Sequence, residues 1–169
     1  MRKWLAALFA AGIGFQVEVV AAATITVATL NDSGPGSLRA ALASAADGDT
    51  VNFSVTGTIT LTSGELLVNK SLAILGPGPA NLALDGNAAS RVLRIAPSNT
   101  VTIADLTVTN GRISASFPDG YGGGLYNDRS TLTLSNCTLH GNSAAVAGGG
   151  HLPRRFVGPR EVDDLQQQG

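Results

Sequence analysis

Cysteine, charged residues and aromatic residues are all scarce in this sequence of 169 residues. It contains one cysteine, Cys137, while charged residues make up 14% and aromatic residues 5%. One thiol excludes an intrachain disulfide. A formal net charge of -1 gives no electrostatic basis for binding nucleic acid or an anionic membrane surface. We therefore predict no nucleic-acid partner and no disulfide framework.

The sequence also has no apolar run long enough to cross a membrane. Arg2 and Lys3 precede an apolar run over residues 4–15, which is shorter than the roughly 20 residues that a membrane-spanning helix needs. Residues 21–23 are alanines and provide the small-residue cleavage site of a secretory signal. We predict a signal peptide over residues 1–23, an exported mature chain, and no membrane-spanning segment within it. The alternative is an uncleaved anchor.

What the chain does have is a repeated pattern of Thr, Ser, Asn and Gly around alternating apolar residues. Residues 99–111 and 130–142 are two copies of one pattern, offset by 31 residues, with every apolar position in phase. Such self-similarity indicates a repeat architecture, and the alternation predicts half-buried strands. Cys137 falls on Leu106 of the other copy, so we expect a buried apolar residue there and not a reactive thiol.

One segment breaks the strand pattern. Residues 37–46 place Leu38 and Leu42 on one face of a short helix. Ser37 is the expected N-cap, and Gly48 is expected to follow the helix end. Because a helix of this length is not stable alone, it must lie against an apolar surface.

Short strands with Gly and Asn between them fit a sandwich or a solenoid, and the in-phase repeat favours the solenoid. We predict an all-β fold, a right-handed parallel β-helix over residues 24–150, with the helix at 37–46 as a cap on its first coil. An irregular insert at 111–120 is expected to loop out. The far end has no candidate cap, so we expect it to fray after about residue 140 and to allow self-association.

Several segments resemble one bacterial family. Residues 32–42 read Asp-Ser-Gly-Pro-Gly-Ser-Leu-Arg-Ala-Ala-Leu, residues 46–53 read Ala-Asp-Gly-Asp-Thr-Val-Asn-Phe, and residues 122–127 and 135–145 carry Gly-Gly-x-apolar and Asn-Ser-Ala motifs. They are similar to secreted right-handed β-helix proteins of the CSLREA type, which are related to polymorphic outer-membrane proteins. The resemblance covers residues 24–150. It implies a secreted or outer-membrane location in a bacterium and an adhesin-like role toward glycans or a host surface.

The pattern stops after Gly150. Residues 151–169 are rich in charge and contain neither Thr nor Ser. We interpret the chain as a truncated member whose last residues are a foreign or out-of-frame tail. The alternative is a natural disordered C-terminus.

Parallel β-helices include polysaccharide lyases and hydrolases, so catalysis is the alternative function. Such enzymes need clustered carboxylates on neighbouring coils, since one group takes a proton while another donates one or holds a cation. Asp85 and Asp105 are the candidate pair, with Arg91 or Arg94 beside them. Most acidic residues, however, adjoin Gly or Asn in turns, where Asp bonds to the backbone. We therefore predict no catalytic residues.

Metal and cofactor sites are not expected either. His140 and His151 have no acidic or thiol partner at ligand spacing, and residues 47–49 are too short for a calcium loop. Three hypotheses remain. The chain is a structural or adhesive surface module, a carbohydrate-active enzyme of the β-helix type, or a remnant of a longer protein. We favour the first and third, which are compatible, over the enzyme.

Overall fold

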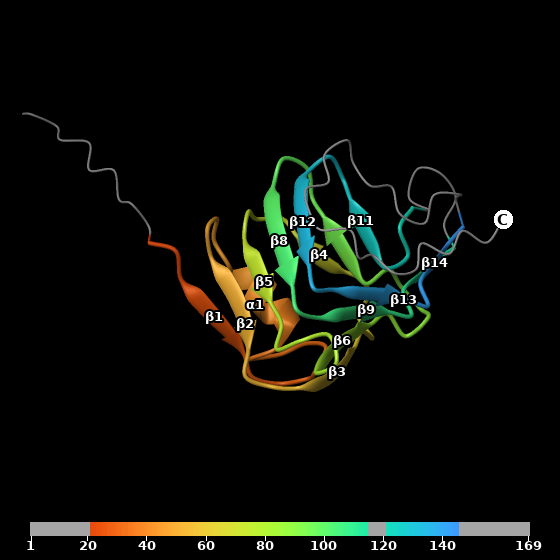
Figure 1. Ribbon diagram of the computed structural model, residues 1–169, viewed down its shortest axis with the longest axis horizontal. Helices are drawn as coiled ribbons and strands as arrows, with labels where there is room; N and C mark the ends of the chain where they lie inside the picture. The colour runs from red at the N-terminus through yellow and green to blue at the C-terminus, as the bar shows by residue number, and fades with distance from the viewer. Residues whose placement is uncertain (1–20, 115–120, 146–169) are drawn as a thin grey trace, which may run out of the picture.

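The computed structural model describes residues 21–114 and 121–145 of the chain. They form an all-parallel β-solenoid of about 4 turns with one short helix, and the predicted fold class is confirmed. The turns advance from the red β1 to the blue β12 in Figure 1. The predicted signal peptide up to residue 20 and the aberrant tail at 151–169 lie outside the described residues.

Each turn adds strands to sheets that run along the solenoid. Sheet A contains β1 (Thr24–Val27), β2 (Thr50–Phe53), β5 (Ala73–Leu75), β8 (Thr100–Ala104) and β12 (Thr131–Ser135). Sheet B contains β3 (Gly57–Thr60), β6 (Leu82–Asp85), β9 (Thr107–Thr109) and β13 (Thr138–His140). Sheet C contains β4 (Leu66–Val68), β7 (Leu93–Ile95) and β11 (Leu125–Asn127). A two-stranded sheet joins β10 (Arg112–Ile113) to β14 (Ser143–Ala144).

The sequence repeat corresponds to one turn of the solenoid. Strand β8 pairs with β12 so that Ile103 lies beside Leu134, and the register of β9 with β13 places Val108 beside Leu139. Cys137 is half-buried and packs against the core. Its burial raises the pKa of the thiol, which disfavours the reactive thiolate.

The interior is a stack of aliphatic side chains contributed by successive turns. In sheet A, Val51, Ile74, Ile103 and Leu134 lie in register, and none is more than 7% exposed. Since side chains alternate between the faces of a strand, the Thr residues between them face outward. Full burial of one such aliphatic side chain contributes about 1.5 to 3 kcal/mol, so the stacked columns are a major source of stability.

The helix α1 (Leu38–Ser44) covers the first end of this stack. Its Leu38, Ala41 and Leu42 are buried in the core, and it contacts β1 and β4. The Oγ of Ser37 accepts a hydrogen bond from the Ala40 N–H at 3.2 Å, which confirms the predicted N-cap. The predicted cap therefore sits where the first coil would otherwise expose its interior.

The end of the helix differs from the expectation. The helix closes at Ala45, whose backbone is extended, and Gly48 is not its terminating residue. The Asp49 carboxylate accepts from the N–H groups of Ala46 and Ala23, both at 2.8 Å. These bonds lower the pKa of Asp49 against the opposing effect of its burial. They hold the turn that leads from the helix to β2.

The first residues of the expected insert at 111–120 form a strand. Arg112–Ile113 is a strand that pairs with Ser143–Ala144, and residues 115–120 lie outside the described part of the chain. Adjacent coils approach closely here. A Cβ on Gly111 would meet the carbonyl of Gly123, and a Cβ on Gly123 would meet the carbonyl of Ser143. This contact explains why glycine recurs at these positions.

Candidate functional site

The outer face of sheet B carries a column of polar side chains at the ends of its strands. Thr60 of β3 pairs with Asp85 of β6, Asp85 pairs with Thr109 of β9, and Thr109 pairs with His140 of β13. We call these four residues the sheet B column. Their side chains face outward because the intervening Ile59, Leu84, Val108 and Leu139 face the core. Successive members are about 4.8 Å apart, the spacing of neighbouring strands.

Hydrogen bonds fix the middle of the sheet B column. Thr109 Oγ1 lies 3.2 Å from His140 Nδ1. The Asp85 carboxylate accepts from the Asn87 N–H at 2.7 Å and from Asn110 Nδ2 at 3.1 Å. Thr60 and His140 are exposed while Asp85 is half-buried, so the column offers a hydroxyl, a carboxylate and an imidazole to solvent along one line.

This arrangement suits binding better than acid–base catalysis. The column contains one carboxylate, and its imidazole is two strands away from it, at about 9.6 Å, with Thr109 between them. A glycosidase-type reaction needs two carboxyl groups that flank one bond. The described column therefore has donors and acceptors for hydroxyl groups, but no second carboxylate.

The sequence-predicted candidates for catalysis are not brought together. Asp85 ends β6, whereas Asp105 precedes β9 at the opposite end of the same strand pair. Asp105 has a backbone φ of 59° and accepts a hydrogen bond from Asn136 Nδ2 at 2.6 Å. This bond links the bend before β9 to the equivalent bend of the next turn. Arg91 and Arg94 belong to the sheet C side, where both form ion pairs with Glu65.

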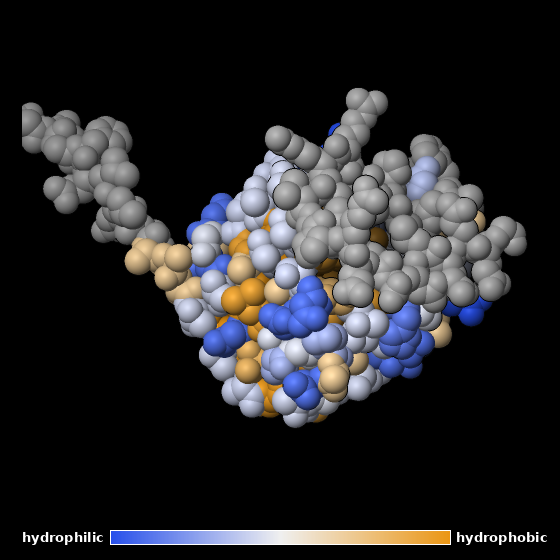
Figure 2. Space-filling view, in the orientation of Figure 1, coloured by the Kyte–Doolittle hydropathy of each residue, from blue (hydrophilic) through white to orange (hydrophobic). Residues whose placement is uncertain are grey.

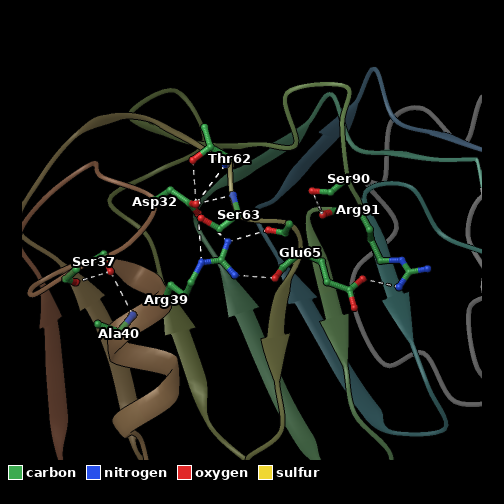
Figure 3. A network of polar contacts seen from close by, with 11 residues as sticks. Asp32, Ser37, Arg39, Ala40, Thr62, Ser63, Glu65, Ser90 and Arg91 are labelled. Atoms are coloured by element: carbon green, nitrogen blue, oxygen red, sulfur yellow. Dashed lines mark hydrogen bonds and ion pairs between the residues drawn. The ribbon is translucent and has the colours of Figure 1, made fainter.

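A second polar group joins α1 to the first full turn. Arg39 Nη2 lies 2.6 Å from Asp32 Oδ1. The same guanidinium donates to the carbonyls of Gly64 and Glu65, at 2.7 and 2.8 Å. Figure 3 shows Arg39 reaching from the helix toward the strand that follows Ser63. Arg39 is therefore paired with an acidic residue of the loop that precedes its own helix.

The other oxygen of Asp32 binds the main chain. Asp32 Oδ2 accepts from the N–H groups of Thr62 and Ser63 at 3.2 and 2.8 Å, and from Thr62 Oγ1 at 3.1 Å (Figure 3). Burial opposes ionisation of this carboxyl, but the bonds from Ser63 and Arg39 outweigh it and hold its pKa well below the usual range. Asp32 is therefore ionised, and it links the capping helix to the main chain after β3.

A third polar group lies on sheet C. Arg91, 4% exposed, pairs with Glu65 at 2.6 Å and donates to the carbonyls of Tyr121 and Gly122. Its guanidinium also lies 4.9 Å from the centre of the Tyr126 ring, a cation–π contact. This group joins three successive turns and is structural.

Beside α1 the surface is hollowed at the edge of sheet B. The hollow has a volume of about 460 Å³ and is lined by Leu30, Asn31, Asp32, Ser33, Thr58, Thr60 and Thr62. We call it the β3 hollow. On the face seen in Figure 2, hydrophobic residues form small groups among hydrophilic ones.

Within residues 21–114 and 121–145, no group of three or more His, Cys, Asp or Glu side chains is placed to hold a metal ion. His140 bonds to Thr109, and His151 lies outside the described residues. No helix in the same part of the chain is both long and apolar enough to cross a membrane.

Comparison with known proteins does not assign the chain to a family. No protein-family model matches the sequence, and no curated protein matches it. The solenoid rests on the structure itself, and the bacterial surface family remains a resemblance carried by residues 24–150.

Proposed function

We propose that this protein is an exported cell-surface β-helix module with a structural or adhesin-like role, and that it binds glycan without cleaving it. The sheet B column carries the proposal. Sugar hydroxyls both donate and accept hydrogen bonds. Thr60, Asp85 and His140 offer matching groups in one line, while Thr109 between them is buried and lies within hydrogen-bond distance of His140. Because these polar groups stand on a rigid sheet, little conformational entropy is lost when they bind a ligand.

Export to the surface of a bacterium is supported by two sequence features. The basic, apolar and small-residue segments of residues 1–23 follow the order of a secretory signal, and residues 24–150 resemble a secreted family. N-terminal sequencing of exported protein should give Thr24 as the first residue. An intact N-terminus in the exported fraction would contradict this part of the proposal.

We also propose that the chain is a fragment of a larger solenoid protein. The strand pattern persists up to Ser143–Ala144, while residues 151–169 contain no Thr or Ser. Translation of the downstream nucleotides in the other frames tests this. Further Gly-Gly-x-apolar repeats are expected there, and their absence would refute the idea.

Glycan binding is tested by comparing the full chain with two variants on a glycan array. His140→Ala and Asp85→Asn each remove a charged or polar partner from the sheet B column, so we expect a loss of about tenfold or more in affinity. Thr131→Ala is the control, since Thr131 is exposed on sheet A and should bind like the unaltered chain. Equal binding by all variants would place the site elsewhere. A shortened polymer after incubation would favour the enzyme.

A further inference from the structure

Sheet A presents an outer face whose strands carry no charged residue. Its five strands stand side by side in Figure 1 and consist of Thr, Ser, Asn, Phe53 and aliphatic residues alone. The outer faces of the neighbouring sheets differ, because Asp85 and His140 lie on sheet B and Arg94 lies on sheet C. The largest sheet of the described solenoid is therefore the uncharged one.

Threonines form a row across this face. The row consists of residues that are successive partners in the parallel pairing of the five strands, namely Thr24, Thr50, Ala73, Thr102 and Thr133. We call it the threonine row. Its members face outward because the residue after each of them packs in the core, as Ile103 does after Thr102. A second pair of threonines, Thr100 and Thr131, lies two residues earlier on β8 and β12. The face therefore repeats hydroxyl groups in two directions.

The two repeat distances follow from the geometry of a parallel sheet. Members of the threonine row are about 4.8 Å apart, the spacing of neighbouring strands. Outward residues of one strand, such as Thr100 and Thr102, are about 6.6 Å apart, which is twice the rise per residue. Because threonine is branched at Cβ, few χ1 rotamers are open to it. Its hydroxyl and methyl groups are therefore held near fixed points of a two-dimensional lattice.

The hydroxyls of this lattice have no partner within residues 21–114 and 121–145. In that part of the chain no hydrogen bond engages a hydroxyl of the threonine row, nor that of Thr100 or Thr131. Threonines on other sheets do bond internally, as Thr107 Oγ1 does by donating to the Pro79 carbonyl at 2.8 Å. The hydroxyls of sheet A are therefore left to bind what lies outside the solenoid.

We propose that the outer face of sheet A binds the surface of ice, a function beyond the proposed glycan binding and on a different sheet. Ice presents water molecules that donate and accept hydrogen bonds, and the oxygen repeats of its prism face are close to both repeats of sheet A. Threonine hydroxyls take the place of lattice water, while their methyl groups are removed from liquid water. A charged group would keep its own hydration shell, which is costly to remove, and these strands carry none. A single glycan or peptide chain, in contrast, is periodic along one direction only.

The lattice is incomplete at β5, and this gap gives a test that depends on gain of function. Ala73 has no hydroxyl, and Leu75 beyond it is 39% exposed. The test measures thermal hysteresis, the difference between the melting and freezing temperatures of an ice crystal in a solution of the full chain. We expect hysteresis that rises with protein concentration. Ala73→Thr completes the threonine row with a residue that suits a strand, and it should increase the hysteresis at equal concentration.

A charged variant provides the reciprocal test. Thr102→Glu places a carboxylate in the threonine row and should abolish the hysteresis. Thr58→Glu is the matched control, since Thr58 is exposed on sheet B, and it should leave the hysteresis unchanged. Unfolding in urea shows whether the two variants are equally folded. Absence of hysteresis in the unaltered chain, or equal hysteresis in the unaltered chain and Thr102→Glu, would overturn the proposal. So would a failure of Ala73→Thr to increase it, and this result does not depend on how well Thr102→Glu folds.

The outcome is separable from carbohydrate binding. Microcrystalline cellulose and chitin are also periodic in two directions, so adsorption to either solid without any hysteresis would overturn the proposal in favour of a crystalline carbohydrate. His140→Ala should lose glycan and keep the hysteresis, since His140 lies on sheet B. Loss of the hysteresis in this variant would contradict a site on sheet A.

Discussion

Arg39 and Asp32 are seven residues apart in the chain, and their side chains meet at 2.6 Å. Arg39 comes from the capping helix, while Asp32 comes from the loop before it and binds the main chain after β3. The Asp32 side chain is 6% exposed, so its charge is stabilised by these partners and not by water. The pair therefore joins the cap to the first complete turn of the solenoid.

Removing the cation of this pair should loosen the cap. Arg39→Ala leaves the Asp32 carboxylate buried without its counter-charge and removes donors to the carbonyls of Gly64 and Glu65. We expect a loss of about 2 to 4 kcal/mol in the free energy of unfolding, measured with urea. Arg129→Ala is the control, because the Arg129 side chain is 83% exposed and should cost less than about 0.5 kcal/mol. Equal effects would show that the pair contributes no specific stability.

The Asp32 carboxylate should make the free energy of unfolding depend on pH in the acidic range. The pKa of Asp32 is lower in the folded chain than in the unfolded chain, so the unfolded state binds more protons as pH falls. Its contribution is present above the ordinary Asp pKa of about 3.9 and is lost progressively below that value. Asp32→Asn should cost about 2 kcal/mol at pH 7 and show a shallower loss of stability from pH 5 to pH 2. An acid dependence as steep as that of the unaltered chain would contradict this assignment.

Core substitutions should cost more stability in the middle of the solenoid than at its far end. Ile103 is fully buried between Ile74 and Leu134, so Ile103→Ala should cost about 2 to 5 kcal/mol. Leu139 is only partly buried on β13, at the far edge of sheet B. Leu139→Ala should cost less than about 1.5 kcal/mol. Chemical denaturation measures both, and a larger cost at Leu139 would show that the far end is the better-packed one.

Glycine should be required where coils touch. A Cβ at Gly123 would meet the carbonyl of Ser143, so Gly123→Ala must displace a strand of the last turn. We expect faster hydrogen exchange over residues 138–145 and a thermal midpoint lower by several degrees. Gly34 has open space around it and a φ of 92°. Gly34→Ala should cost only the local backbone strain and leave that exchange unchanged.

The far end provides a related prediction. Strands β12 and β13 are the last strands of sheets A and B in the described part of the chain. We expect their amides to exchange faster than those of β8 and β9, because no further turn packs on them within residues 21–114 and 121–145 and a solenoid frays from an uncovered end. Uniform protection of the four strands would contradict an open end.

The fold was predictable because the sequence repeat gives the register in which the strands pair. The offset between the two copies places Ile103 on Leu134 and Val108 on Leu139, and the strands pair in that register. Alternation of apolar and polar residues also separates core from surface without any structure.

The contacts made by polar side chains were less predictable. The Thr62 N–H donates to Asp32 across 30 residues and the Ala23 N–H donates to Asp49 across 26 residues. No periodic signal in the sequence marks such partners. The short strand Arg112–Ile113 escaped prediction because two residues carry no recognisable alternation.

The sheet B column could have been found from its position. Thr60, Asp85, Thr109 and His140 each follow an inward apolar residue near the end of a strand, so the register that aligns the core aligns them too. Asp85 and Asp105 look like a pair in the sequence, but they lie at opposite ends of the paired strands β6 and β9.

Mapping a bound glycan on the ¹⁵N spectrum of the full chain tests the central claim most directly. Binding to the sheet B column predicts that the largest shifts fall on Thr60, Asp85, Thr109 and His140, with the length of the glycan unchanged after incubation. Shifts confined to sheet A or sheet C, or a shortened glycan, would contradict the account.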